Sequence, residues 1–433
     1  MNLEATFSLH SRRQFLRRFG LGAAATWTLP VFLERTFSAL EASAAAATQA
    51  ITGKDAPILV VLQLAGGNDG LNTLVPFADD AYYKNRPKLG VSADKVLKLN
   101  DYAGFNPGMT SLKSLYDEGL IGIVQGVGYP NPNRSHFRST EIWQTASDSE
   151  KVINKGWIGR FFDNCCKGAD PTVGVTLTRE FPQAFAAQTP TGVSVEAGLR
   201  LGKRRNMRNM RNMRDSEEDL MMDESSGGSI DMLSGSARPE LSPFEYLQRT
   251  ALDAQLSQDK IRDILAKIPA SSAFPKTRLG QQFSLISRLI AGELPTRIYY
   301  LSQGGFDTHN NQVPSHSRLL ADFSDAVTAF VREMQTQGNY SRVMLMTFSE
   351  FGRRVRENDS GGTDHGTAAP VFLSGGALKP GLHGDPPSLT KLDDGDLIHT
   401  VDFRDVYATF LDKWLGADSV DVLGARFRHV GFV

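Results

Sequence analysis

Short apolar runs, each followed at once by a polar or glycine-rich loop, alternate along this chain with amphipathic stretches. Apolar runs of this length predict buried β-strands, and their alternation with helices is typical of a mostly parallel sheet that is covered on both faces. We therefore expect an α/β fold, a three-layer αβα sandwich. The predicted strands are residues 58–64, 121–127, 297–302, 343–348 and 371–373.

The expected helices show the matching periodicity. A helix is predicted around residues 112–116, and two longer ones carry apolar side chains at helical spacing. A further helix begins at Ser242-Pro243-Phe244-Glu245, which combines a capping box with Pro at the first helical position. The two apolar faces consist of Leu279, Phe283, Ile286 and Ile290, and of Leu319, Phe323, Val327 and Phe330.

The amino terminus resembles a twin-arginine export signal. Residues 11–17 read Ser-Arg-Arg-Gln-Phe-Leu-Arg, an apolar run over 19–33 follows, and Ala42-Ser43-Ala44 is a small-x-small cleavage pattern. A transmembrane anchor is the alternative, but the run contains Pro30 and is shorter than the roughly 20 residues of a spanning helix. We expect a signal peptide at 1–44, a linker at 45–56 and a domain at 57–433. The protein is then periplasmic or secreted, with the twin-arginine machinery as a partner.

The composition excludes some classes of protein. The net charge is -1 for 433 residues, and removal of residues 1–44, with five Arg and three Glu, leaves about -3, so nothing indicates a nucleic-acid partner. The two cysteines, Cys165 and Cys166, are adjacent, a spacing that makes a disulfide between them awkward and provides no disulfide framework. Packing, helped by a metal, must therefore supply the stability.

Residues 203–236 do not resemble part of a packed core. Three Arg-Asn-Met triplets precede an acidic run and then Ser and Gly. We interpret this stretch as a disordered surface insertion. Thioethers favour Cu(I), so a copper site at Met207, Met210 and Met213 is the alternative.

Two loops that follow predicted strands carry side chains suited to catalysis. Asp69, in Gly66-Gly67-Asn68-Asp69-Gly70, would project a carboxylate over the sheet edge, although Asn-Asp-Gly also forms ordinary turns. Ser135 lies at the start of an expected helix, where backbone N–H groups would stabilise an anion or an alkoxide. The alternative is that Ser135 only caps this helix.

Three more loops carry metal-ligand residue types. Asp307 and His309 follow one strand, Glu350 follows another, and Asp364 and His365 precede a third. Ligands gather at the carboxyl ends of strands in open α/β sheets, and this mixture of carboxylate and imidazole suits zinc or manganese. We expect one or two divalent ions. Three nearby guanidinium groups, of Arg134, Arg138 and Arg353, are candidates to hold anionic oxygens.

Five segments occur in an order that resembles domain-of-unknown-function family 1501, over about residues 58–433. They are Gly-Gly-Asn-Asp-Gly, Asn-Arg-Ser-His-Phe, Gly-Phe-Asp-Thr-His, Ser-Glu-Phe-Gly-Arg and Thr-Asp-His-Gly-Thr. That family is similar in fold and motif order to the alkaline phosphatase superfamily, which includes phosphatases, sulfatases and phosphodiesterases. The resemblance implies an alkaline-phosphatase-like domain and a small anionic ester as substrate.

The resemblance also implies roles for individual residues. Asp69 corresponds to a ligand of one metal and Ser135 to the nucleophile. Asp307 and His309 correspond to ligands of the other metal, and His365 to the last ligand histidine. Glu350 occupies the position of the Asp in an Asp-His pair of the superfamily, and Phe351 occupies the position of the His.

Asp364 then either replaces the missing histidine ligand or orients His365. His136 is another candidate to replace that ligand. The shorter Asp307-to-His309 spacing and Phe351 are departures from the pattern.

Two functions follow from these patterns. The first is an exported metal-dependent hydrolase of phosphate or sulfate esters, with Ser135 as nucleophile and Arg134 and Arg353 as anion-binding residues. The second is a non-catalytic metal-binding or structural envelope protein that keeps the fold. No pattern predicts the oligomeric state.

Overall fold

The computed structural model describes residues 55–189, 191–195 and 256–433. The predicted signal peptide at 1–44, most of the linker at 45–56, the insertion at 203–236 and the helix beginning at Ser242 lie outside the described residues. The rest of the predicted domain is described and contains one large sheet.

The large sheet has nine strands, and its order is β11-β5-β10-β9-β1-β8-β6-β7, with β14 paired to β5. All five predicted strands are present in it. The strands are β1 (Ile58–Ala65), β5 (Gly122–Gly128), β6 (Gly174–Thr176), β7 (Val193–Ser194), β8 (Ile298–Gly304), β9 (Val343–Phe348), β10 (Ala369–Gly375), β11 (Gly381–His383) and β14 (Val401–Asp402).

The sheet is mostly parallel, as the sequence predicts. β1 pairs in parallel with both β8 and β9, whereas β10 runs antiparallel to its neighbours β5 and β9. The amino end of β10 therefore lies at the edge of the sheet where β1, β5, β8 and β9 have their carboxyl ends. Loops after four strands and the loop before a fifth meet there.

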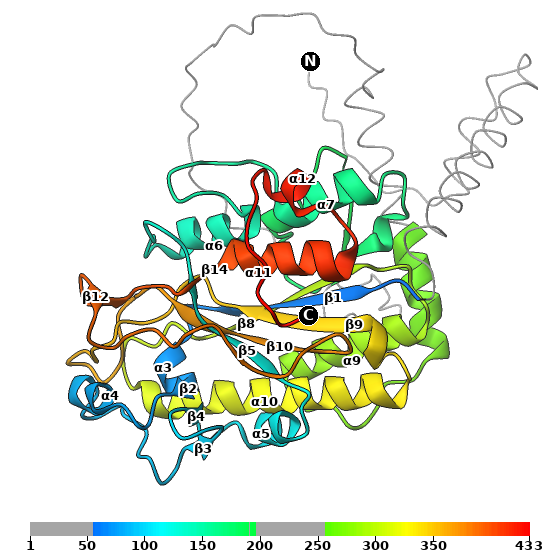
Figure 1. Ribbon diagram of the computed structural model, residues 1–433. Coiled ribbons are helices and arrows are strands. Elements are labelled where there is room, and N and C mark those ends of the chain that lie inside the picture. Colours follow the sequence, from blue (N-terminus) through cyan, green and yellow to red (C-terminus); the bar gives the residue numbers. More distant parts are fainter. Residues whose placement is uncertain (1–54, 190, 196–255) are drawn as a thin grey trace, which may run out of the picture.

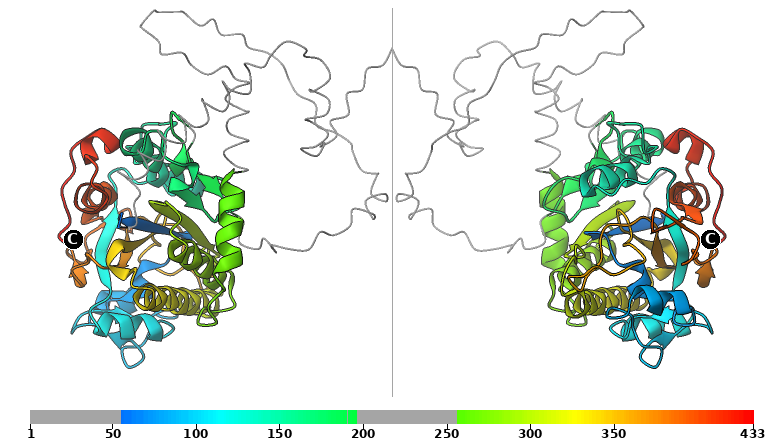
Figure 2. Two further views of the ribbon diagram at one scale, coloured as in Figure 1. Left: turned by 90° about the vertical axis from the view of Figure 1, so that its right-hand side faces the viewer. Right: turned by 90° about the vertical axis from the view of Figure 1, so that its left-hand side faces the viewer.

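Helices cover both faces of the sheet, which confirms the three-layer arrangement (Figures 1 and 2). One face carries α5, α9 and α10, and residues 256–267 form a further helix whose Ile261 and Leu265 belong to the same core. The opposite face carries α6, α7, α11 and α12. The bounds are α5 (Thr110–Asp117), α9 (Arg278–Ala291) and α10 (Gln312–Thr336), then α6 (His136–Thr145), α7 (Trp157–Cys165), α11 (Phe403–Phe410) and α12 (Ser419–Leu423).

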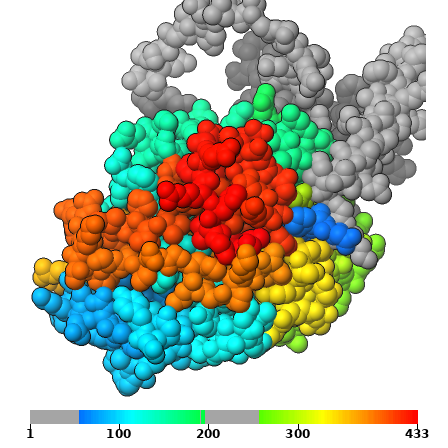
Figure 3. Space-filling view, viewed as in Figure 1, coloured from blue at the N-terminus to red at the C-terminus, as the bar shows by residue number. Residues whose placement is uncertain are grey.

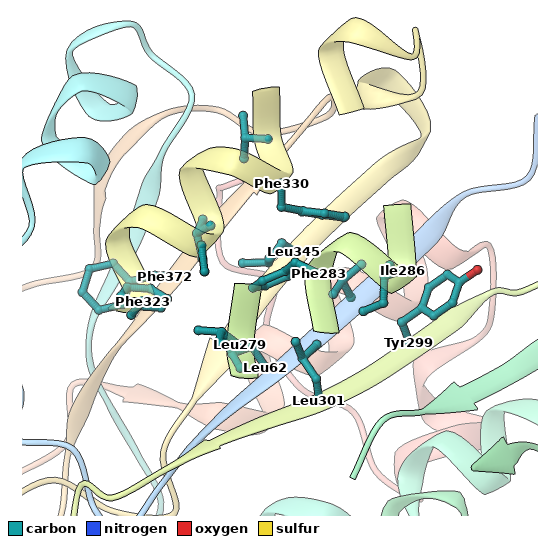
Figure 4. Packing of buried hydrophobic residues seen from close by; sticks show 14 of the residues in the cluster. Leu62, Leu279, Phe283, Ile286, Tyr299, Leu301, Phe323, Phe330, Leu345 and Phe372 are labelled. Atoms are coloured by element: carbon teal, nitrogen blue, oxygen red, sulfur yellow. The ribbon is translucent and has the colours of Figure 1, made fainter. Parts of the chain in front are cut away.

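The two cores follow from the alternation of side chains along the strands. In β1, Ile58, Val60, Leu62 and Leu64 face the α9 and α10 layer, and Leu59 and Val61 face the α7 and α11 layer. Figure 4 shows the first of these cores, in which Phe283 of α9 and Phe330 of α10 pack with ring centroids 4.9 Å apart. Both predicted helical faces are thereby confirmed, although Leu319 is only partly buried.

Smaller elements surround the sheet. The C-terminal residues, red in Figure 3, pack against the green residues around α7, with Phe432 fully buried. The short strands and helices are α3 (Gly70–Thr73), β2 (Leu74–Val75), α4 (Asp80–Asn85), β3 (Leu97–Lys98), β4 (Gly104–Phe105), β12 (Leu392–Asp393) and β13 (Asp396–Leu397). Single turns are η1 (Pro171–Val173), η2 (Gln183–Phe185), η3 (Tyr340–Arg342) and η4 (Leu411–Leu415).

Two further findings concern the cysteines and the length of the helices. Cys165 and Cys166 are both free thiols, in agreement with the expected lack of a disulfide framework. Within the described parts of the chain, none of the helices has the length and apolar character needed to cross a membrane.

Candidate metal centre

Five loops meet at the edge of the sheet nearest α3 (Figure 1). They follow β1, β8 and β9, precede β10, and lead from β5 into α6. Among the described residues, one group of side chains there has the geometry to hold a metal ion: His136, Asp307 and His365 place ligand atoms within 4.8 Å of one another. His309 lies beside them, since its Nε2 is 3.0 Å from Asp307 Oδ1 and 2.9 Å from His365 Nε2.

Three imidazole Nε2 atoms converge on the Asp307 carboxylate. His309 and His365 approach Oδ1, at 3.0 and 3.3 Å, and His136 approaches Oδ2 at 3.5 Å. With Zn–N bonds of about 2.0 Å, two nitrogens on one tetrahedral zinc lie about 3.3 Å apart. The one N–N separation at hand, 2.9 Å between His309 and His365, and the N–O separations of 3.0–3.5 Å are close to that value.

Each imidazole is oriented through its other nitrogen. His365 Nδ1 lies 2.8 Å from the Arg134 carbonyl, His136 Nδ1 lies 2.9 Å from Glu350 Oε1, and His309 Nδ1 lies 3.3 Å from Asp364 Oδ1. Carbonyl and carboxylate oxygens only accept hydrogen bonds, so a proton on Nδ1 satisfies each of these contacts. In that tautomer the Nε2 atoms present lone pairs, the arrangement found in metal-binding histidines.

These residues fit a divalent cation. His309 Nε2 and His365 Nε2 lie 2.9 Å apart, a separation that suits either an imidazole–imidazole hydrogen bond or two nitrogens on one ion. His136 Nε2 is an enclosed atom that has no hydrogen-bond partner among the described residues. Three nitrogens with one carboxylate are a ligand set typical of zinc, which accepts His and Asp in tetrahedral sites.

Arg353 holds the Asp307 carboxylate in place. Its guanidinium donates to Asp307 Oδ1 at 2.7 Å and to the carbonyls of Gly66, Gly67, Phe306 and Thr363. Burial opposes ionisation of Asp307, but the hydrogen bond and charge of Arg353 outweigh it and set its pKa at about 2. Asp307 is therefore ionised and ready to act as a ligand.

The Gly66-Gly67 turn is required for this close packing. Both glycines have positive φ, 117° and 74°. A Cβ on Gly66 would lie 2.5 Å from the Asp307 nitrogen, and one on Gly67 would lie 2.4 Å from the Phe351 ring. Only glycine allows the β1 loop to approach the other loops so closely.

Glu350 acts on the cluster through His136. It is buried, and its Oε1 accepts from the Gly66 N–H at 2.7 Å as well as from His136. The hydrogen bond that His136 donates to Glu350 raises the pKa of His136 above its ordinary value. Glu350, expected as a direct metal ligand, thus uses its Oε1 to hold His136 and the Gly66 backbone.

Phe351 packs against two imidazoles of the cluster. Its ring centroid is 4.8 Å from that of His136 and 4.6 Å from that of His365, and it is only 2% exposed. Burial in this aromatic group lowers the pKa of His365. A neutral His365 is the form that binds metal.

Ser135 is exposed at the start of α6, directly before His136. It occupies the N-cap position, but its side chain makes no capping hydrogen bond. The expected alternative, a Ser135 hydroxyl used to cap the helix, is therefore not seen in this structure. Its backbone N–H donates to Asn133 Oδ1 at 2.8 Å, which leaves the hydroxyl at the positive end of the helix.

Asp69 does not project over the sheet edge as expected. It is fully buried, and its Oδ2 pairs with Arg86 Nη1 at 2.6 Å and accepts from Gln312. Asp364 also differs from expectation, because it pairs with His309 and not with His365. Both corrections have the same cause: loop packing sets the direction of a side chain, and neither motif encodes that packing.

The two arginines expected to bind an anion are engaged within the protein. Arg134 forms ion pairs with Asp394 and Asp396, and Arg353 is buried with the acceptors named above. Arg138, a third candidate, donates to backbone carbonyls of the loop after α6 and pairs with Glu141. These guanidinium groups thus make contacts within the protein, with Arg353 buried and the Arg134 side chain 37% exposed.

Sequence reasoning placed His136 only as a substitute and did not include Arg86. One signal could have predicted that His136 belongs to the cluster. It directly follows Ser135 and so lies at the first position of a helix that begins at the edge of the sheet. Arg86 is 17 residues from Asp69 in the sequence, and no local pattern connects them.

A comparison with protein-family models gives one match, DUF1501, described as a protein of unknown function, over residues 121–425. This range covers more than half of the chain. The chain belongs to the DUF1501 family. The matched range includes every residue of the metal cluster, whereas Asp69 and Arg86 precede it. No curated protein matches this DUF1501 member in sequence.

Several solved structures overlap weakly with this DUF1501 protein. The PsFucS1 sulfatase from Pseudoalteromonas sp. is 10% identical, with 89% of this chain and 72% of its own covered and a TM-score of 0.36. The lipoteichoic acid synthase LtaP from Listeria monocytogenes is 8% identical, over 81% and 76%, with a TM-score of 0.35. The alkaline phosphatase from the Antarctic bacterium TAB5 is 10% identical, over 74% and 92%, with a TM-score of 0.32.

Proposed function

We propose that this DUF1501 protein is a metal-dependent hydrolase of phosphate or sulfate esters, with Ser135 as its nucleophile. One observation carries the proposal: three oriented imidazoles and an ionised carboxylate converge at a helix amino terminus, and an exposed serine, Ser135, directly precedes one of the imidazoles in the sequence. Ser135 and Asp307 are both exposed enough for a small ester to reach them.

His136, His309, His365 and Asp307 would hold the ion. A divalent ion there would act as a Lewis acid that lowers the pKa of a nearby hydroxyl and offsets the charge of the ester. Zinc matches these ligands best, and manganese is the second choice. Glu350, Asp364 and the Arg134 carbonyl keep the three rings in their binding orientation.

Ser135 would carry the covalent step. Its Oγ loses a proton and bonds to phosphorus or sulfur, while the bond from that atom to the alcohol oxygen breaks and the alcohol leaves with a proton. Water then hydrolyses the seryl ester and restores the hydroxyl. The amino terminus of α6 stabilises negative charge at Oγ during both steps.

The test replaces Ser135 and measures both turnover and metal content. We expect Ser135→Ala to lose turnover of aryl phosphate or aryl sulfate by at least about 10³-fold while it retains the metal content of the wild type. Ser149→Ala, in the loop after the same helix, is the matched control and should turn over like the wild type. Unchanged activity in Ser135→Ala would remove this residue as the nucleophile.

A non-catalytic metal-binding protein of the cell envelope is the second candidate. The engagement of Arg134 and Arg353 with internal partners favours it, because a hydrolase of this class needs cationic groups free to hold anionic oxygens. Saturable turnover of either ester by the zinc-loaded protein, lost in Ser135→Ala, would eliminate this candidate.

We also propose export by the twin-arginine pathway, supported by Arg12-Arg13 and the apolar run that follows. The full chain should be found in the periplasmic fraction, with the segment before residue 45 removed. The variant Arg12→Lys/Arg13→Lys should stay uncleaved in the cytoplasm. Normal processing of this variant would contradict the proposed route.

A further inference from the structure

The Asp69 carboxylate lies in a fully buried setting that already contains a cation. Asp69 has no exposed surface, and Arg86 is 1% exposed. Arg86 Nη1 lies 2.6 Å from Asp69 Oδ2, a short charge-assisted contact. An ionised carboxylate in the interior needs such a partner, because isolated burial of the charge is very unfavourable.

Arg86 is fixed in this position by the backbone of a distant loop. Its Nε donates to the Val355 carbonyl at 2.9 Å, its Nη2 donates to the Arg354 carbonyl at 2.8 Å, and Nη1 also donates to Asn72 Oδ1 at 2.8 Å. A guanidinium with these acceptors cannot turn away to make room for an ion. The positive charge beside Asp69 is thus a permanent part of the fold.

Gln312 connects this ion pair with the loops of the metal cluster. Its Nε2 donates to Asp69 Oδ2, while its Oε1 accepts from Thr308 and Thr363 at 3.2 and 2.7 Å. Thr308 precedes His309, and Thr363 lies two residues before His365. The Asp69–Arg86 pair therefore supports the loops that carry two of the proposed ligands without contacting the ion.

The side chains of the neighbouring loops offer little to a second ion. Phe351, after β9, supplies no donor atom, and Glu350 Oε1 is used by His136 and Gly66. His316 is 2% exposed and bonded to Asn68 Oδ1 at 2.9 Å. Two carboxylate oxygens, Asp69 Oδ1 and Glu350 Oε2, have no hydrogen-bond partner among the described residues.

We infer that the Arg86 guanidinium takes the place of a second metal ion, so that the centre binds one divalent ion per chain and Asp69 is not a ligand. This inference rests on the proposed metal site and specifies its composition. Arg86 is in this view a positioning residue: it neutralises Asp69, and the pair holds the loops through Gln312.

Cobalt titration of the metal-free full chain tests the count. Co²⁺ bound by nitrogen and oxygen gives visible absorption bands, and we expect them to saturate at one equivalent in the wild type and in Asp69→Asn. His365→Ala should lose the bands. A second equivalent in the wild type that is absent from Asp69→Asn would overturn the inference and leave the proposed function standing. A wild type that binds no cobalt, zinc or manganese would overturn both.

A second set of variants tests whether Arg86 replaces the charge of a metal ion or only supports the fold. Arg86→Gln leaves Asp69 without its cation, and we expect this variant to bind an additional, weaker cobalt equivalent. Arg86→Lys keeps the positive charge, and Asp69→Asn/Arg86→Gln removes both charges. Neither of these variants should bind the additional cobalt equivalent. Equal cobalt binding by all three variants would contradict the assigned role of Arg86. The wild-type and Asp69→Asn titrations decide the ion count even if Arg86→Gln does not fold.

Discussion

A buried histidine beneath the metal loops should make stability depend on pH. His316, in the first turns of α10, is 2% exposed and bonded to Asn68 Oδ1. Burial lowers its pKa from 6.5 to about 4, and the positive charges of Arg86 and Arg353 act in the same direction, against the attraction of Asp69. The folded protein therefore keeps His316 neutral at a pH where the unfolded chain protonates it.

The sign and size of the effect follow from this difference in pKa. Between pH 6.5 and 4 the unfolded state binds the proton and the folded state does not, so the free energy of unfolding falls as the pH falls. With pKa values of 6.5 and 4, lowering the pH from 7 to 5 removes about 2 kcal/mol of stability. Full stability is present only above pH 6.5.

Urea unfolding of the metal-free protein, followed by tryptophan fluorescence at pH 7 and pH 5, measures this loss. Other titrating groups contribute equally to the wild type and to His316→Gln, so the comparison isolates His316. We expect the wild type to lose about 2 kcal/mol more than the variant. His383→Gln, on strand β11, is the control and should follow the wild type. Losses that agree within about 0.5 kcal/mol in wild type and His316→Gln would refute the reasoning.

Three further predictions concern the metal centre and the core. Glu350→Gln should weaken zinc binding by about 10- to 100-fold, because the partner that orients His136 is weakened; competition with a chromogenic chelator measures this. Adding zinc at about 1,000 times its Kd should raise the free energy of unfolding by about 4 kcal/mol, whereas His365→Ala should show no such gain. Phe283→Ala should cost about 3–5 kcal/mol in urea unfolding, while Phe137→Ala, 91% exposed in the wild type, should cost less than about 0.5 kcal/mol.

Much of the fold could be predicted because strands and helices leave periodic patterns in the sequence. The five predicted strands lie in the large sheet, with boundaries that differ by only a few residues. The antiparallel direction of β10 had no such signal, since the length of an apolar run does not encode its direction. That direction brings His365 to the ends of the parallel strands.

The residue types of the candidate site were also predictable, but their roles were not. Asp307, His309 and His365 do gather at one point, because each lies at the end of a strand that reaches the same edge of the sheet. Arg353, expected to bind an anion, instead holds Asp307 and four backbone carbonyls. A guanidinium suits either task equally well, and only its surroundings distinguish them.

The sequence by itself determined the α/β class, the two apolar helix faces and the set of loops that supply ligand types. These properties depend on local periodicity and on the chemistry of single side chains. Only the tertiary structure decided that His136 joins the cluster, that Glu350 orients it and that Arg86 neutralises Asp69. Each of these depends on contacts between residues that are distant in the sequence. A buried charge needs a partner, and the packing of the loops decides which side chain is close enough to be that partner.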